Sequence, residues 1–223
     1  MRTKNAMSQI RENLTDETGF KRTPRQERGY LRVKQILDAA ASLITEHGAE
    51  QLTIQNLSKA AQTSPGSLYH FFPDLNAVIR ALSERHEESI SAIIQGLENT
   101  VSQDEWRDGN AHSFIRRLFS PYEQYLLGNR DYLPVLQLRG FTFEGSGFLD
   151  FMKKVMQLRY PQWDEDKVIS EAVFLHAIAT GVLQQAFRRE ENMAYEFIPG
   201  IFCVLELYLS HLETESLNNI AQV

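Results

Sequence analysis

Residues 55–78, QNLSKAAQTSPGSLYHFFPDLNAV, carry the pattern that decides the fold of this chain. Two short helical segments meet here at a tight turn. In the first, Leu57, Ala60 and Ala61 have the spacing of a buried helical face, and Thr53 is a good N-cap residue for it. We therefore predict a short helix directly after Thr53.

The second segment predicts a helix of only about seven residues. Ser64 is expected to cap it, Pro65 suits its first position, and Pro73 ends it. Leu68 and Phe72 lie four residues apart and form its predicted inner stripe. The other side chains of this helix are therefore expected to face away from the core.

This pair of helices meets the requirements of a helix-turn-helix, in which a braced first helix supports a second that enters the DNA major groove. Backbone N–H groups near Ser64 and Ser67 suit a phosphate oxygen. The Tyr69 hydroxyl can reach phosphate, and His70 can hydrogen-bond a base edge or the backbone. Two alternatives stay open: Tyr69 as a partly buried helix residue, and His70 as an ordinary surface histidine.

The rest of the sequence also shows helical periodicity, so we predict an all-α fold. We expect a flexible basic arm over 1–28, a helix-turn-helix domain over 29–80, and a helical domain over 81–223. Asp74 is expected to cap a long fourth helix. Further helices are expected near 114–126, 130–138, 148–156, 164–189 and 194–212.

Composition and charge limit the classes of function that are possible for this chain. The chain has 223 residues and a net charge of −6, yet residues 1–34 hold nine basic and four acidic residues. Such asymmetry is typical of a basic arm on an acidic body, although a plain disordered tail has the same composition. No signal peptide or membrane span is evident, so a cytoplasmic location is expected. The single cysteine, Cys203, is expected in the core.

The sequence gives little reason to expect an enzyme. It contains no Gly-rich phosphate loop, H-E-x-x-H or G-x-S-x-G motif. One cysteine excludes a multi-cysteine metal site. His86 stands beside two glutamates and is interpreted as part of a surface charge run. We therefore expect no catalytic activity, metal or cofactor.

Residues 36–82 resemble the DNA-binding domain of the TetR family of transcriptional regulators. The resemblance rests on an Ala-Ala pair, Gly48, Leu-Thr-Ile, and Ser-x-Gly-Ser-Leu-Tyr-x-x-Phe, in that order. It implies three N-terminal helices for DNA and about six more for ligand binding and dimerisation. It also implies dimers that bind palindromic operators and release them when a small molecule binds.

The resemblance assigns DNA contacts to matching positions. They are Thr53, Ser64, Gly66, Ser67, Tyr69 and His70. Two departures remove polar contacts, because Pro65 and Leu75 stand where the family often has polar or basic residues. Affinity is then expected to depend more on basic residues of the arm, such as Arg25, Arg28 and Arg32, which can enter a minor groove.

Aromatic and sulfur side chains gather in the second domain. Ordinary core packing explains most of them, but ligand pockets are also mostly apolar with a few polar groups. The candidate pocket residues are Phe114, Leu118, Tyr122, Tyr125, Phe141, Phe148, Phe151, Met152, Phe174 and His176.

The last two long helices carry apolar stripes that suit a four-helix dimer interface, with packing inside one chain as the alternative. The resemblance favours the dimer. The candidate interface residues are Ala172, Leu175, Ala179, Val182, Ala186, Ile198, Ile201, Phe202, Leu205 and Leu209.

These observations favour a dimeric repressor that binds double-stranded operator DNA and is released by a small apolar or aromatic effector. Two alternatives remain. One is a DNA-binding adaptor that responds to a protein partner, and the other is a helical binding protein whose helix-turn-helix is idle. The sequence does not identify the effector or the operator.

Overall fold

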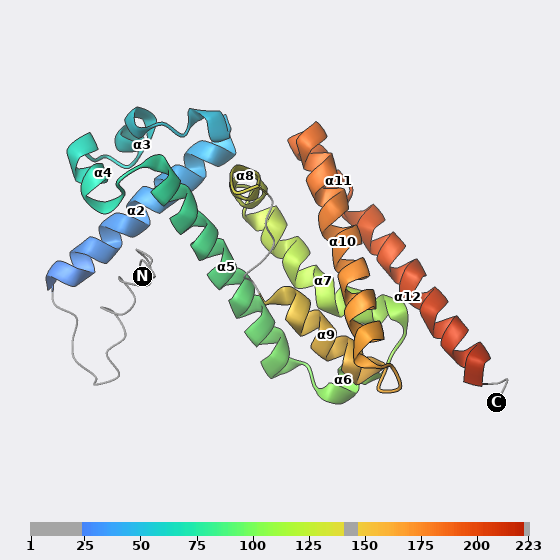
Figure 1. The fold of residues 1–223 in the computed structure, drawn as a ribbon. Helices are drawn as coiled ribbons and strands as arrows, with labels where there is room; N and C mark the ends of the chain where they lie inside the picture. The colour runs from blue at the N-terminus through green and yellow to red at the C-terminus, as the bar shows by residue number, and fades with distance from the viewer. Residues whose placement is uncertain (1–23, 141–146, 221–223) are drawn as a thin grey trace. The chain divides into compact units, whose positions relative to one another are not determined.

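The computed structural model describes the backbone of residues 24–140 and 147–220, and the side chains of 27–140 and 147–214. Every regular element in these ranges is helical, which confirms the all-α prediction. The chain divides into an N-terminal unit, residues up to 86 with 130–142, and a C-terminal unit, 87–129 with 143–223. Figure 1 draws the helices of both units.

The N-terminal unit is built from four helices, a 3-10 turn and the first part of a long helix. These are α2 (Pro24–His47), η1 (Ala49–Gln51), α3 (Ile54–Ala60), α4 (Pro65–Phe71), α5 (Leu75–Thr100) and α8 (Tyr132–Leu138). In Figure 1, α2, α3 and α4 pack together. Their shared core consists of Val33, Ile36, Leu37, Ala40, Ile44, Leu52, Leu57, Ala61, Leu68, Phe72, Ala77, Val78, Ala81, Leu82 and Val135.

Local hydrogen bonds start the helices of this unit as predicted. The Thr53 hydroxyl accepts a hydrogen bond from the Asn56 N–H at 3.1 Å at the start of α3. Ser64 accepts one from the Ser67 N–H at 3.1 Å at the start of α4, and Asp74 caps α5. Each cap satisfies a backbone donor that the first turn leaves without an intrahelical partner.

The C-terminal unit contains the end of α5 and six further helices. These are α6 (Gln103–Arg107), α7 (Ala111–Gly128), α9 (Phe148–Arg159), α10 (Glu165–Arg189), α11 (Glu191–Glu196) and α12 (Ile198–Ile220). The helices α7, α10 and α12 lie side by side in Figure 1.

Three details differ from the predictions. The helix α2 already begins at Pro24, because proline at a first helical position loses no hydrogen bond. The short α6 was not predicted, although Ser102 and Glu105 form a capping box that the sequence S-x-x-E signals. Ala60, expected to pack inward, is exposed at the end of α3.

Two predicted environments are also corrected. Cys203 is exposed on α12 rather than buried. His86 is only 2% exposed, because it shares a face of α5 with buried Leu82 and Ile90, four residues to either side. The Asp131 carboxylate supplies its polar partner, with Nε2 and Oδ2 3.2 Å apart.

Arg159 fastens three parts of the C-terminal unit together. Its side chain is 5% exposed and forms a salt bridge with Glu213 of α12. Its Nη2 donates to the Gly109 carbonyl at 2.9 Å, and its guanidinium lies 5.0 Å from the centre of the Phe114 ring. Because these partners come from the α6–α7 loop, α7 and α12, one side chain at the end of α9 joins elements far apart in sequence.

We expect Arg159→Met to lower the free energy of unfolding of the C-terminal unit by about 3 kcal/mol, since it leaves the partly buried Glu213 carboxylate without its cationic partner and only the Tyr160 hydroxyl to donate to it. Trp106 and Trp163 both lie in this unit, so tryptophan fluorescence in urea measures the change. Lys154→Met is the control, because the exposed Lys154–Glu98 pair contributes less than about 1 kcal/mol. Equal losses in the two variants would contradict the assigned role of Arg159.

Candidate functional site

The helix α4 presents one face to the core and another to solvent. Leu68 is fully buried, and Phe72 directly after the helix is 2% exposed. Tyr69 is 51% exposed, and His70 is exposed as well. The predicted outward orientation of Tyr69 and His70 is therefore confirmed.

The turn before α4 adds small polar groups to this surface. Ser64, Pro65, Gly66 and Thr53 are exposed, and Ser67 is half-buried. The hydroxyls of Thr53 and Ser64 accept hydrogen bonds as helix caps. Each hydroxyl still has its own O–H to donate, which suits a phosphate oxygen. Helix capping and DNA contact are thus compatible at both positions.

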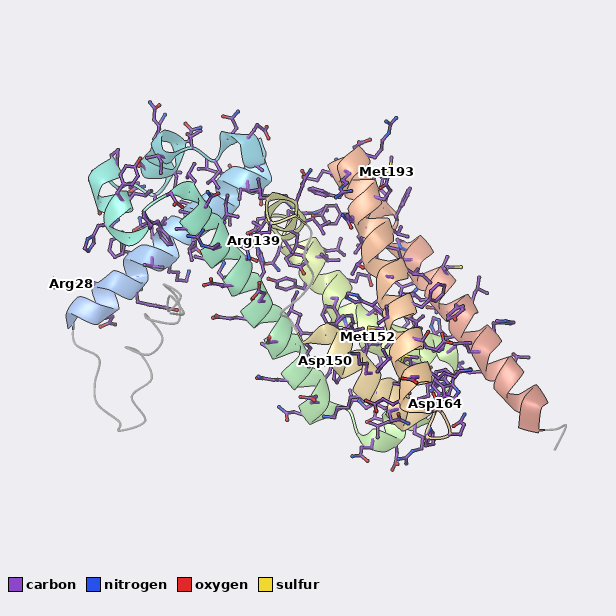
Figure 2. All side chains as sticks on the ribbon, in the orientation of Figure 1. Arg28, Arg139, Asp150, Met152, Asp164 and Met193 are labelled. Carbon is purple, nitrogen blue, oxygen red and sulfur yellow. The ribbon has the colours of Figure 1, made fainter. Side chains whose placement is uncertain are left out.

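Two of the arginines predicted to contact DNA lie on a helix, α2. Arg28 is exposed on α2 and labelled in Figure 2. Arg32 is half-buried, and its Nη1 donates to Gln35 Oε1 at 3.0 Å. Because α2 begins at Pro24, the expected flexible arm does not extend to residue 28. The Arg25 side chain and the rest of the arm lie outside the described residues.

A buried contact between Asp131 and His86 holds α8 in the N-terminal unit. Asp131 is 5% exposed and faces His86, while Arg85 Nη2 lies 3.6 Å from its Oδ2. Burial alone would raise the pKa of Asp131, but the hydrogen bond and charge of His86 and the charge of Arg85 lower it. Arg85 also pairs with Asp38 of α2 at 2.8 Å. The sequence offered no local signal for this network, because Asp131 is 45 residues from His86.

Some predicted pocket residues form an aromatic cluster in the C-terminal unit. The Phe148 ring centre lies 4.1 Å from that of Tyr122 and 6.0 Å from that of His176. Burial lowers the pKa of His176, since a charged imidazole would lose hydration there. This places one titratable group against the aromatic core.

The remaining predicted pocket residues are dispersed. Phe114, Leu118, Phe151 and Met152 are core residues, and Met152 is labelled in Figure 2. Phe174 is 47% exposed and contacts the Tyr208 ring at 4.8 Å between centroids. Tyr125 is half-buried, and Phe141 lies outside the described residues.

A cavity of ≈ 60 Å³ lies among α7, α10 and α12. Its lining is almost entirely apolar, with Glu123 as its one charged residue among those described. Of the predicted pocket residues that the structure describes, only Tyr122 lines it, whereas five predicted interface residues do. The lining residues are Phe119, Tyr122, Glu123, Leu126, Ala179, Leu183, Ile198, Ile201, Phe202 and Leu205.

Nine of the ten predicted interface residues are buried inside the single chain, and only Val182 is exposed, at 37%. A buried side chain has no surface to offer a second chain, so these stripes serve the core of the protomer. Both helices carry other apolar side chains outward. The exposed set on these helices is Ile169, Val173, Phe174, Val182, Val204 and Leu207, and Phe197 is exposed directly before α12.

Two helical segments, α10 and the stretch from α11 into α12, are long and apolar enough to cross a membrane by length and composition alone. Of the most apolar 18-residue stretch in each segment, only 22% is buried in Glu165–Arg189 and 39% in Glu191–Thr214. Exposed apolar helix faces of this kind are also typical of interfaces between protein chains. Within the described residues, no group of three His, Cys, Asp or Glu side chains is placed to hold a metal ion.

Because the pKa of His176 is lowered on folding, the unfolded chain binds its proton more readily than the folded one. We therefore expect the C-terminal unit to lose stability as pH falls below about 6.5, by at most about 1.4 kcal/mol per pH unit from this group. Urea unfolding at pH 7 and pH 5, followed by tryptophan fluorescence, measures the loss. His176→Gln is expected to reduce it and the exposed-site control His211→Gln to preserve it; an unchanged loss in His176→Gln would refute this.

Comparisons with known proteins agree with this geometry. Residues 36–82 match the model of the family described as "Bacterial regulatory proteins, tetR family". The nucleoid occlusion factor SlmA of Haemophilus ducreyi is 34% identical over 64 residues, which are 28% of this chain and 32% of SlmA. This chain therefore spans about a third of the length of that relative.

Other similarities extend over most of the chain. YvdT of Bacillus subtilis, described as an uncharacterized HTH-type transcriptional regulator, is 25% identical over 183 residues, 79% of this chain and 87% of YvdT. The crystal structure of the Bacillus subtilis transcriptional regulator FadR with stearoyl-CoA is similar in fold, with a TM-score of 0.55 and 16% identity over 78% of this chain and 97% of FadR. The chain therefore carries the helix-turn-helix domain of the TetR family of transcriptional regulators, followed by a helical C-terminal region.

Proposed function

We propose that this protein is a dimeric, cytoplasmic transcriptional repressor that binds palindromic operator DNA and is released by a small apolar or aromatic ligand. The proposal rests on the burial of one side of α4 and the exposure of the other. Leu68 is fully buried while the adjacent Tyr69 is 51% exposed. A helix fixed to its own core on one side can present the opposite side to a major groove.

The contacts proposed for DNA have distinct tasks. Tyr69 and the hydroxyls of Thr53 and Ser64 suit phosphate oxygens, which set the position of the protein on the duplex. His70 can reach a base edge and so contribute to sequence recognition. Arg28 and Arg32, four residues apart on α2, would add salt-dependent contacts to phosphate. Because they lie on a helix, they are held in place rather than carried on a flexible arm.

Dimerisation is proposed through the exposed apolar faces of α10 and α12. Leu207 is 66% exposed and Val204 is 49% exposed, which leaves large apolar side chains in water in a single chain. Covering them with the same helices of a second copy would bury that surface. A fixed dimer would also set the separation of the two copies of α4, which must match successive major grooves.

The effector is proposed to enter between α7, α10 and α12. The cavity there is almost entirely apolar, but its ≈ 60 Å³ is far below the roughly 300–1,000 Å³ of a typical ligand site. A ligand would therefore have to move α7, α10 and α12 apart, and two of these helices, α10 and α12, carry the proposed dimer faces. Such a ligand lowers DNA affinity only to the extent that it binds the non-DNA form more tightly. The stearoyl-CoA bound to FadR is consistent with an effector that has an apolar chain.

A protein partner in place of a small effector is the second candidate. The similarity to a nucleoid occlusion factor favours it only weakly, because the match covers 28% of this chain. A screen of apolar and aromatic compounds for release of bound DNA separates the two. Release by a compound supports the effector, and release by a protein alone supports the adaptor.

The double variant Tyr69→Phe/His70→Ala tests the DNA surface. Loss of the Tyr69 hydrogen bond to phosphate and of the His70 hydrogen bond to a base edge is expected to weaken binding by about tenfold in total or more. Fluorescence anisotropy with labelled DNA from upstream of the protein's own gene measures the affinity. The control is Tyr125→Phe/His211→Ala, which makes the same changes in the C-terminal unit. If the protein forms no specific complex, or if both double variants bind like the wild type, the repressor proposal fails.

The double variant Val204→Glu/Leu207→Glu tests the dimer. Two charges on an apolar interface are expected to convert the dimer to a monomer, because each glutamate would have to lose its hydration. Light scattering coupled to gel filtration measures the mass. Leu127→Glu on α7 is the control, since Leu127 is a comparably exposed leucine, at 47%, outside α10 and α12. A wild-type chain that is already a monomer would reject the interface.

A further inference from the structure

A cavity of ≈ 270 Å³ lies within the N-terminal unit, between α5 and the C-terminal end of α8. The proposed function uses neither this cavity nor its residues, because the DNA contacts lie on α2, the start of α3 and α4, and the proposed effector cavity lies in the C-terminal unit. Its lining residues are Asn76, Ile79, Arg80, Leu138 and Arg139.

The two walls of this cavity are held by regular structure. Asn76, Ile79 and Arg80 are spaced three and four residues apart, so they share one face of α5. Arg139 is the C-cap residue of α8, and its backbone N–H bonds to the Val135 carbonyl at 3.1 Å. Val135 is 1% exposed in the unit's core. The helix that carries Arg139 is therefore anchored to the same core as α5.

The charged residues that line the cavity are both positive. Arg80 and Arg139 are both exposed, and none of the five described lining residues is acidic. Within the described part of the chain, neither arginine forms a salt bridge. Arg85, one to two turns further along α5, is different, because Asp38 and Asp131 both pair with it. Among the described residues, positive charge is thus balanced by acidic partners at Arg85 and has no acidic partner in the cavity.

Two guanidinium groups beside one cavity favour an oxyanion as the ligand. A guanidinium binds phosphate through two parallel N–H···O bonds, and its charge is permanent. The Asn76 amide can donate a further hydrogen bond. The Ile79 and Leu138 side chains give the same cavity an apolar part, and Leu138 is 44% exposed there.

We propose that this cavity binds a small organic molecule through a phosphate or pyrophosphate group, with its organic part against Ile79 and Leu138. DNA is a second source of phosphate, but a concave site of ≈ 270 Å³ offers more room than one backbone phosphate occupies. That volume approaches the lower end, about 300 Å³, of sites for small molecules.

The test is to titrate inorganic pyrophosphate into the 223-residue protein at low salt and to measure binding by isothermal titration calorimetry. One pyrophosphate per chain is expected to bind the wild type, and Arg80→Gln/Arg139→Gln to weaken binding at least about tenfold. The control Arg188→Gln/Arg189→Gln removes the same charge from exposed residues at the end of α10 and is expected to bind like the wild type. A second variant, Leu138→Glu, places an acid beside both arginines and is expected to abolish binding.

The proposal is overturned if pyrophosphate does not bind the wild type, or binds both arginine double variants equally. A DNA titration at several salt concentrations separates the two sources of phosphate. If pyrophosphate binding is absent and Arg80→Gln/Arg139→Gln lowers the salt slope by about 0.9 per arginine, the two residues contact DNA instead. The calorimetric result needs no DNA, so it stands or falls independently of the repressor proposal.

Discussion

The burial of Leu68 and Phe72 in the core of the N-terminal unit is the constraint on which the rest depends. The helix α4 has only seven residues, too few to be stable alone in water. It exists because its inner side chains join the apolar cluster of α2, α3 and α5, and because Ser64 caps its first turn. The same anchoring decides that Tyr69 faces solvent. The DNA-binding proposal follows from this division of one short helix into two faces.

In the C-terminal unit, α10 and α12 also have one buried face and one exposed face, and the two faces have different roles. Their inner residues, such as Leu175 and Leu205, are fully buried and complete the protomer. Their outer residues, such as Leu207, remain in water in a single chain. Arg159 then fastens α9 to α12 and to the loop before α7. A ligand that opened the cavity among α7, α10 and α12 would have to act on helices that also carry the proposed dimer faces, which couples the two events physically.

The charged side chains of the N-terminal unit also fall into two groups, one paired within the protein and one without an acidic partner among the described residues. Asp131 and Asp38 both pair with Arg85, Asp131 also contacts His86, and this network joins α8 to α5 and α2. Arg80 and Arg139 have no such balance among the described residues, although they border the same two elements, α5 and α8. The contrast distinguishes ion pairs that hold the helices together from charges available to a ligand.

Features that depend on residues close together in the chain could be predicted without the structure. The caps at Thr53 and Ser64 and the outward direction of Tyr69 could be predicted because hydrogen bonds and helical spacing span only three or four residues. Which stripe of α10 and α12 is buried could not be predicted, since both helices are apolar on more than one face and periodicity cannot choose between them; it follows from how the helices pack. The burial of His86 also depends on packing, because a buried polar side chain needs a partner, here Asp131, that the chain brings from 45 residues away.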